Sequence, residues 1–142
     1  MIKTIYISGG IAGLKPPDVI AYFNALQLNL EKFGFNVYSP IRGKILDTEV
    51  SQKYGVNEIV HRDENDIMMS DLMIAFPSIK SIGTYMEIYL ARKIRQIPVI
   101  VIATDPHIIN HYWIRAYASK IVSTPDEAIE YLLKWYSPTK WS

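Results

Sequence analysis

A carboxylate that could act as a nucleophile ends the segment 81–87 (Ser-Ile-Gly-Thr-Tyr-Met-Glu), which leads from an apolar run into a helical pattern. We expect Glu87 in the first turn of that helix, where the macrodipole stabilises a carboxylate by about 0.3–1 kcal/mol. The side chain would then stay ionised, as a nucleophile must. The residues alone favour the alternative that Glu87 serves only the start of the helix.

A glycine-rich turn follows the first β-branched run, in the segment 6–13 (Tyr-Ile-Ser-Gly-Gly-Ile-Ala-Gly). Glycines there let a ligand approach the backbone and leave amide N–H groups free to bind an anion. The spacing is neither GxGxxG nor a Walker loop, which argues against dinucleotide and P-loop nucleotide binding. A tight turn without a ligand is the alternative.

A third group of chemically capable residues is acidic and lies at 62–66 (Arg-Asp-Glu-Asn-Asp), followed by Asp71. Asp63 and Asp71 are eight residues apart, and a helix would bring them near the same face after about two turns. Asp71 directly precedes an apolar run, a position more typical of a cap or turn residue. The other carboxylates could equally form a solvated helix face.

Metal binding has weak support in the sequence. His107 and His111 have the i, i+4 spacing that can chelate a metal, but no third ligand is apparent. The chain has no cysteine, which excludes disulfides, cysteine zinc sites, iron–sulfur clusters and thiol nucleophiles. We therefore expect neither a metal nor a cofactor.

These residues must be positioned by a chain that alternates short β-rich runs with helical patterns. Apolar or β-branched runs predict strands at 4–8, 36–39, 72–76, 98–102 and 120–122. Apolar periodicity predicts helices at 18–33, 58–70, 83–96 and 108–118. A final helix starts with Thr124 as N-cap, Pro125 at its first position and Glu127 completing a capping box. The polar segment 42–55 predicts a long loop.

The strand runs are apolar without in–out alternation, which is typical of strands buried on both faces. Strands alternating with helices predict an α/β fold, a doubly wound sheet of about five parallel strands with helices on both faces. Ligands of such sheets bind at the carboxyl ends of strands, near the point where strand order reverses. The loops after Ser8, Ser39, Phe76 and Ile102 should therefore line the site.

Size and charge limit the classes of function. The 142 residues and 16.3 kDa fit one domain spanning 1–142. A net charge of +1, from 15 basic and 14 acidic residues, gives no electrostatic case for a nucleic acid polymer or an anionic membrane. The longest apolar stretch, Ile97 to Ala103, is too short for a bilayer, which needs about 20 residues. We expect a cytoplasmic protein.

Taken together, the motifs resemble the nucleoside 2-deoxyribosyltransferase family over roughly residues 3–105. The matching parts are Tyr-Ile-Ser-Gly at 6–9, Arg62-Asp63 with Asp71 eight residues later, Gly-Thr-Tyr-Met-Glu at 83–87, Ala91, and Pro-Val-Ile at 98–100. Some details are similar to one branch, the 2′-deoxynucleoside 5′-phosphate N-hydrolases. In that branch a serine stands six residues before the catalytic glutamate, as Ser81 stands before Glu87. The eighteen residues from Asp63 to Ser81 also match the branch.

The chain departs from this branch at two phosphate-side positions. The hydrolases have a serine where this chain has Gly10 and an arginine where it has Ala12. A later serine, which reaches the phosphate bound by the neighbouring subunit, corresponds to His111. The choice between a nucleoside and its 5′-monophosphate therefore stays open, as does the choice between hydrolysis and transfer to another base.

The resemblance implies cleavage of the N-glycosidic bond of a 2′-deoxynucleoside or its 5′-monophosphate. Glu87 would be the nucleophile, Asp63 would protonate or position the leaving base, and Tyr6 would hydrogen-bond Glu87 and orient it. The remaining predicted site residues would bind the sugar or phosphate: Ser8, Gly9, Gly10, Ser81, Gly83 and His111. The resemblance also implies a homo-oligomer, in which the aromatic segment 111–117 could form a contact or simply pack on the sheet.

Two alternatives come from other classes of protein. A non-catalytic nucleotide-binding or sensing module could use the same fold and glycine turn. A doubly wound domain without any small ligand is the other. The presence of Tyr6, Asp63 and Glu87 together favours the enzyme, because a module that only binds has no need of all three.

Overall fold

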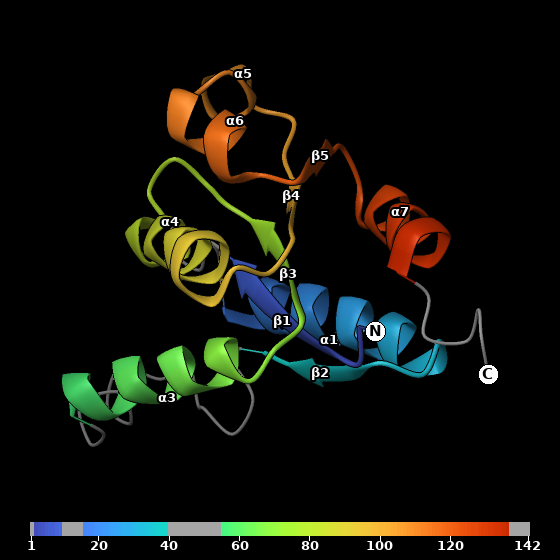
Figure 1. The fold of residues 1–142 in the computed structure, drawn as a ribbon, viewed down its shortest axis with the longest axis horizontal. Coiled ribbons are helices and arrows are strands. Elements are labelled where there is room, and N and C mark those ends of the chain that lie inside the picture. Colours follow the sequence, from blue (N-terminus) through green and yellow to red (C-terminus); the bar gives the residue numbers. More distant parts are fainter. Residues whose placement is uncertain (1, 10–15, 40–54, 137–142) are drawn as a thin grey trace.

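The computed structural model describes residues 2–9, 16–39 and 55–136. Its sheet has five strands in the order β2-β1-β3-β4-β5, and every neighbouring pair is parallel (Figure 1). The strands are β1 (Thr4–Gly9), β2 (Asn36–Tyr38), β3 (Leu72–Phe76), β4 (Val99–Ile102) and β5 (Lys120–Val122). The predicted parallel α/β sheet is confirmed. Its strand order reverses between β1 and β3, which places the topological switch point there.

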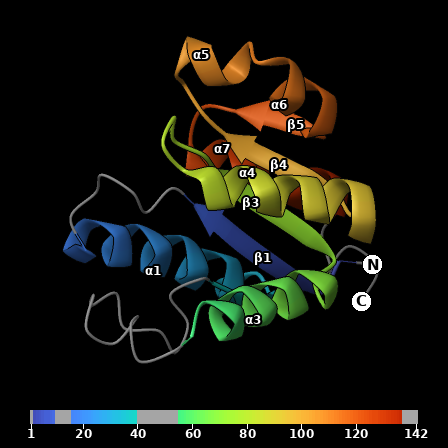
Figure 2. The same ribbon diagram turned by 90° about the vertical axis from the view of Figure 1, so that its left-hand side faces the viewer.

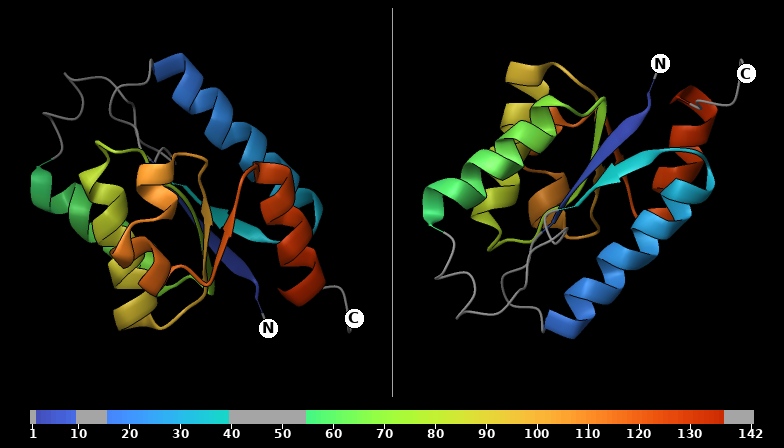
Figure 3. Two further views of the ribbon diagram at one scale, coloured as in Figure 1. Left: turned by 90° about the horizontal axis from the view of Figure 1, so that it is seen from above. Right: turned by 90° about the horizontal axis from the view of Figure 1, so that it is seen from below.

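The helices lie on both faces of this sheet. They are α1 (Pro16–Lys32), α3 (Val56–Met68), α4 (Ile82–Tyr89), α5 (Pro106–Ile109), α6 (Tyr112–Tyr117) and α7 (Pro125–Tyr136). Figure 2 shows α3 and α4 on either side of the line of β1, and Figure 3 shows α1 and α7 across the sheet from them. None of the helices within 16–39 and 55–136 is long and apolar enough to cross a bilayer.

Side chains alternate between the two faces of the sheet along each strand, and each face packs into its own hydrophobic core. On one face Ile5 and Ile7 of β1 pack with α1 and α7, in a cluster that includes Phe23 and Leu132. On the other face Tyr6 packs in a second cluster, with residues of α3, α4 and α6. Because successive strand residues point to opposite faces, Ser8 shares the second face with Tyr6.

Two ends of helices lie where single residues of the sequence predicted them, at the end of α1 and the start of α7. Gly34 ends α1 with a φ of 92°, in the left-handed region that glycine adopts without strain. Thr124 is the N-cap of α7, since its Oγ1 accepts from the Glu127 N–H at 3.1 Å. The Glu127 carboxylate accepts from the N–H of Ser123 rather than from that of Thr124, so the capping box is shifted by one residue.

Two predicted helices differ from the observed elements. The helix expected at 83–96 is α4 followed by a π-helical turn, η1 (Leu90–Arg95). The helix expected at 108–118 is interrupted, because Asp105 caps α5 and the His111 ring caps a separate α6. The loop predicted at 42–55 lies outside the described residues except for Gly55.

Gly9 ends β1 where the backbone passes close to an aromatic ring. A Cβ placed on Gly9 would overlap the ring of its register partner Phe76. That ring cannot move freely, because its centroid lies 4.4 Å from that of Tyr22 and 4.9 Å from that of Phe23. Glycine is therefore required here by the close approach of the ring.

Gly9→Ala should lower the free energy of unfolding by about 1–3 kcal/mol, the usual cost of overpacking a core. Urea unfolding monitored by circular dichroism measures the change. The matched control is Gly83→Ala, because a Cβ at Gly83 meets nothing and alanine favours the helix. A Gly9→Ala protein as stable as the wild type would contradict the packing described for Phe76.

Candidate active site

The Glu87 carboxylate is held by two hydroxyl groups of β1. The Tyr6 hydroxyl donates to Glu87 Oε2 at 2.7 Å, and the Ser8 hydroxyl donates to Glu87 Oε1 at 2.7 Å. Tyr6 and Ser8 are fully buried, whereas the Glu87 side chain is partly exposed. The arrangement presents a fixed carboxylate that a ligand can reach.

The position of Glu87 within its helix corrects one prediction. Ser81 is the N-cap of α4 and Ile82 its first residue, so Glu87 lies in the second turn, and the first turn contains no acidic residue. The expected stabilisation by the helix terminus was wrong, because that effect falls off within the first turn. The two hydroxyl donors stabilise the carboxylate instead, since hydrogen bonds to an ionised group are among the strong ones.

Asp63, on α3, acts electrostatically on the Tyr6 hydroxyl. Burial raises the pKa of Tyr6 above its ordinary value, and the negative charges of Glu87 and Asp63 raise it further. The hydrogen bond to Glu87 and the charge of the buried Asp66 act in the same direction. The Tyr6 hydroxyl of β1 thus contacts Glu87 of α4 and is influenced electrostatically by Asp63 of α3.

This environment keeps Tyr6 protonated, with a consequence at alkaline pH. Below pH 10 the tyrosine is protonated in both the folded and the unfolded chain, so its stabilising effect is fully present. Above pH 10 the unfolded chain loses the proton and the folded chain keeps it, so the free energy of unfolding falls. Wild type should lose up to about 1.4 kcal/mol per pH unit more than Tyr6→Phe in this range.

Urea unfolding of both proteins at pH 9, 10 and 11 checks this expectation. The two curves of stability against pH should run parallel up to pH 10 and diverge above it. Curves that stay parallel to pH 11 would show that Tyr6 does not hold its proton against these carboxylates.

Asp71 belongs to the opposite end of the sheet. Its Oδ2 accepts from the backbone N–H groups of Lys3 at 3.0 Å and Thr4 at 2.9 Å, where β1 begins. The interpretation of Asp71 as a cap or turn residue is confirmed. It ties the starts of β1 and β3 together and lies away from the carboxyl ends where the site is expected.

The turn between β3 and α4 holds Ser81, and its hydroxyl closes that turn. Ser81 Oγ accepts from the Ser78 N–H at 2.8 Å and donates to the Ser78 carbonyl at 2.7 Å. The Tyr85 hydroxyl donates to the same carbonyl at 2.9 Å. Gly83 is exposed in the first turn of α4. Substrate binding by Ser81 and Gly83 stays a prediction.

Ser78 is a polar residue of this turn that is not among the predicted site residues. Its Oγ is buried without a hydrogen-bond partner in the part of the chain that the structure describes. The only sequence signal for it is its place directly after Pro77, in the loop that follows β3.

His107 and His111 contact residues close to them in the sequence. His111 caps α6 by accepting from the Trp113 N–H through Nδ1 at 3.2 Å, and His107 contacts Asp105 at 3.2 Å. Within 2–9, 16–39 and 55–136, no three His, Asp or Glu side chains gather as a metal site requires. Phosphate binding by His111 stays a prediction, and Gly10 lies outside the described residues. Homo-oligomer formation also stays a prediction. Within the predicted contact segment 111–117, the Tyr112 side chain is 85% exposed.

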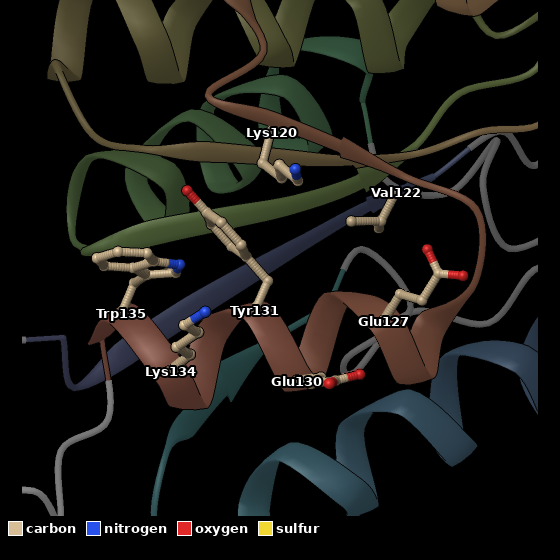
Figure 4. Close-up of a pocket in the computed structure, with 7 residues that line it drawn as sticks. All are labelled: Lys120, Val122, Glu127, Glu130, Tyr131, Lys134 and Trp135. Atoms are coloured by element: carbon tan, nitrogen blue, oxygen red, sulfur yellow. The ribbon is translucent and has the colours of Figure 1, made fainter.

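A surface groove lies elsewhere, between β5 and α7 (Figure 4). Tyr131 extends from α7 toward Lys120 of β5, and the Lys120 Nζ lies 5.7 Å from the tyrosine ring centroid. The groove is also lined by Val122, Glu127, Glu130, Lys134 and Trp135. None of its lining residues belongs to the predicted site, and α7 packs on the face of the sheet opposite Tyr6.

Comparisons with known proteins place this architecture among solved structures. No protein-family model and no curated protein sequence matches the chain. A conserved protein from Enterococcus faecalis V583 is similar in structure, with a TM-score of 0.72 and 17% identity over 94% of this chain and 99% of that one. A 2-deoxyribosyltransferase from Bacillus psychrosaccharolyticus is also similar in structure, with a TM-score of 0.67 and 15% sequence identity over 88% of this chain and 89% of that one.

The CMP N-glycosidase BcmB from Clostridium botulinum is also similar, with a TM-score of 0.64 and 21% identity over 94% of this chain and 99% of that one. These matches extend over nearly the whole of each chain, so the likeness is one of overall fold. The chain therefore shares its fold with a 2-deoxyribosyltransferase and with a CMP N-glycosidase.

Proposed function

We propose that this protein cleaves the N-glycosidic bond of a 2′-deoxynucleoside or its 5′-monophosphate, by hydrolysis or by transfer of the sugar to another base. The observation that carries the proposal is the partly exposed Glu87 carboxylate fixed through both oxygens by buried hydroxyls. The fold adds support, because a 2-deoxyribosyltransferase and a CMP N-glycosidase share it.

In the first step Glu87 attacks the anomeric carbon from the face opposite the base. The bond from that carbon to the base nitrogen breaks, its electron pair leaves with the base, and Asp63 supplies a proton to the departing base. The product is a sugar ester of Glu87. Because the transition state resembles an oxocarbenium ion, the negative charge of the Glu87 carboxylate stabilises it.

In the second step an acceptor resolves the ester. Water or a second base attacks the anomeric carbon, the bond to Glu87 breaks, and the carboxylate is restored with its two hydroxyl donors. Asp63, now ionised, takes the proton that the acceptor loses, as in retaining glycosidases. Hydrolysis and transfer share the same intermediate, so the acceptor that reaches it decides the outcome.

The proposal is tested by chromatography of the products formed from a panel of deoxynucleosides and deoxynucleoside 5′-monophosphates, each with and without an added acceptor base. Free base without an acceptor indicates hydrolysis, and a new nucleoside with an acceptor indicates transfer. Thermal shifts measured on the same panel identify a binding module, in which a ligand stabilises the protein but no base is released. That outcome would replace the proposed function.

A further inference from the structure

The Ser8 hydroxyl donates to the second carboxylate oxygen of Glu87, and the sheet fixes the position of Ser8. β1 is a central strand, paired with β2 on one side and β3 on the other. Tyr6 and Ser8 are two residues apart on it and meet the same carboxylate, one at each oxygen. The Ser8 side chain is fully buried.

We propose that Ser8 is a positioning residue that acts on the reaction through Glu87, without contacting the sugar or the phosphate. The inference rests on the proposed function and deepens it. A carboxylate anchored only at Oε2 can rotate about its contact with Tyr6. A second anchor at Oε1 removes that rotation and fixes the plane from which Glu87 attacks.

The chemistry of a hydroxyl supports this assignment over phosphate binding. A serine hydroxyl carries one proton, and in this structure that proton is directed to Glu87 Oε1. Ser8 therefore has no proton left to donate to a phosphate while the contact persists. Its burial also separates it from the solvent side, from which a substrate reaches Glu87.

Negative charges near Tyr6 increase the importance of the Ser8 hydroxyl as a hydrogen-bond donor to Glu87. Tyr6 on β1 faces Glu87 directly, and Asp63 and Asp66 on α3 act on the same hydroxyl of Tyr6. Without the Ser8 hydroxyl, the Glu87 carboxylate would have one hydrogen-bond donor fewer. The ionised form of Glu87 would then be less favoured, and protonation would compete at a higher pH.

The first experiment compares the wild type with Ser8→Ala, on whichever substrate of the panel releases base. We expect kcat to fall roughly tenfold to a hundredfold, the range for a hydrogen bond to a charged group, while KM stays within about twofold. The acidic limb of the pH profile should move up by about one pH unit, because the ionised fraction of Glu87 is lost at a higher pH.

Two conservative variants refine the test. Ser8→Thr keeps the hydroxyl and should restore most of kcat and the position of the acidic limb. Ser8→Cys keeps the volume with a weaker donor and should lie between Ser8→Ala and the wild type. The matched control is Ser70→Ala, which removes a buried hydroxyl bonded to the Asp66 carbonyl and should leave kcat and the acidic limb unchanged.

A higher KM in Ser8→Ala, with kcat and the acidic limb unchanged, would overturn the inference and return Ser8 to the substrate side. A Ser8→Ala protein with wild-type kinetics would overturn it as well. Should Ser8→Ala fail to fold, the order of kcat among wild type, Ser8→Thr and Ser8→Cys gives the same decision.

A double-mutant cycle separates failure of this inference from failure of the proposed function. The stabilities of wild type, Ser8→Ala, Glu87→Ala and the double variant are measured by urea unfolding, which needs no activity. Non-additive losses support the hold of Ser8 on Glu87, and additive losses overturn it. A wild type that releases no base on the whole panel refutes the proposed function whatever the cycle shows.

Discussion

Glu87→Ala should abolish release of free base from every substrate that the wild type accepts. The variant removes the atom that would form the bond to the anomeric carbon, and the loss of a nucleophile of this kind costs roughly 10⁴–10⁶ in kcat. Glu87→Gln should be nearly as inactive, because an amide of the same shape carries no charge to stabilise the oxocarbenium-like transition state. The measurement is base release by chromatography over hours at high enzyme concentration.

The control for this experiment is Glu130→Gln, on α7 and exposed on the other face of the sheet. It makes the same chemical change away from Tyr6 and Ser8, and it should keep full activity. If Glu87→Ala releases base at the wild-type rate, Glu87 has no part in the reaction, and the mechanism fails at its first step.

Asp63→Asn should slow the reaction by an amount that depends on the leaving base. A general acid contributes roughly 10²–10⁴ to the rate when the leaving group needs a proton. We expect losses in this range for bases that depart poorly without protonation, and small losses for bases that depart readily as anions. The measurement is a plot of log kcat against the basicity of the leaving base, which should be steeper for Asp63→Asn than for wild type.

Glu64→Gln is the matched control, because it neutralises the adjacent carboxylate of α3, which contacts His61 at 3.5 Å. Its plot should have the wild-type slope. An Asp63→Asn plot with the wild-type slope, displaced by a constant amount, would show that Asp63 positions the substrate and does not transfer the proton.

The parts of the fold that the sequence predicted are those encoded by neighbouring residues. The expected strand 72–76 has the bounds of β3 itself, because five apolar residues are closed by Pro77. The end of α1 at Gly34 and the start of α7 at Thr124 follow from single residues with strong conformational preferences. The parallel sheet follows from the order of these segments.

Interruptions of helices were harder to predict. The split near residue 110 depends on Asp105 accepting from the His107 N–H and on the His111 ring accepting from the Trp113 N–H. Asp105 followed by Pro106 was an available signal for a new helix start. The π-helical turn at 90–95 has no comparable signal, because its residues fit an ordinary helical pattern.

The candidate site depends on contacts between distant parts of the sequence. Tyr6 and Glu87 are 81 residues apart, and only the family resemblance suggested the hydrogen bond that the structure contains. The contact of Ser8 with Glu87 was missed, although strand alternation already placed Ser8 on the face of Tyr6. A period of two indicates which side chains share a face, but it does not say which helix covers them.

The central claim is that Glu87 carries the sugar between the two chemical steps. It is tested most directly by mass spectrometry of the wild type after mixing with an accepted substrate, acid quenching within one turnover and proteolysis. We predict a peptide containing Glu87 whose mass is increased by one deoxyribosyl group, or its 5′-phosphate, and the loss of this species in Glu87→Gln. A sugar found on a different peptide, or a full turnover of base release with no sugar on any peptide, would contradict the claim.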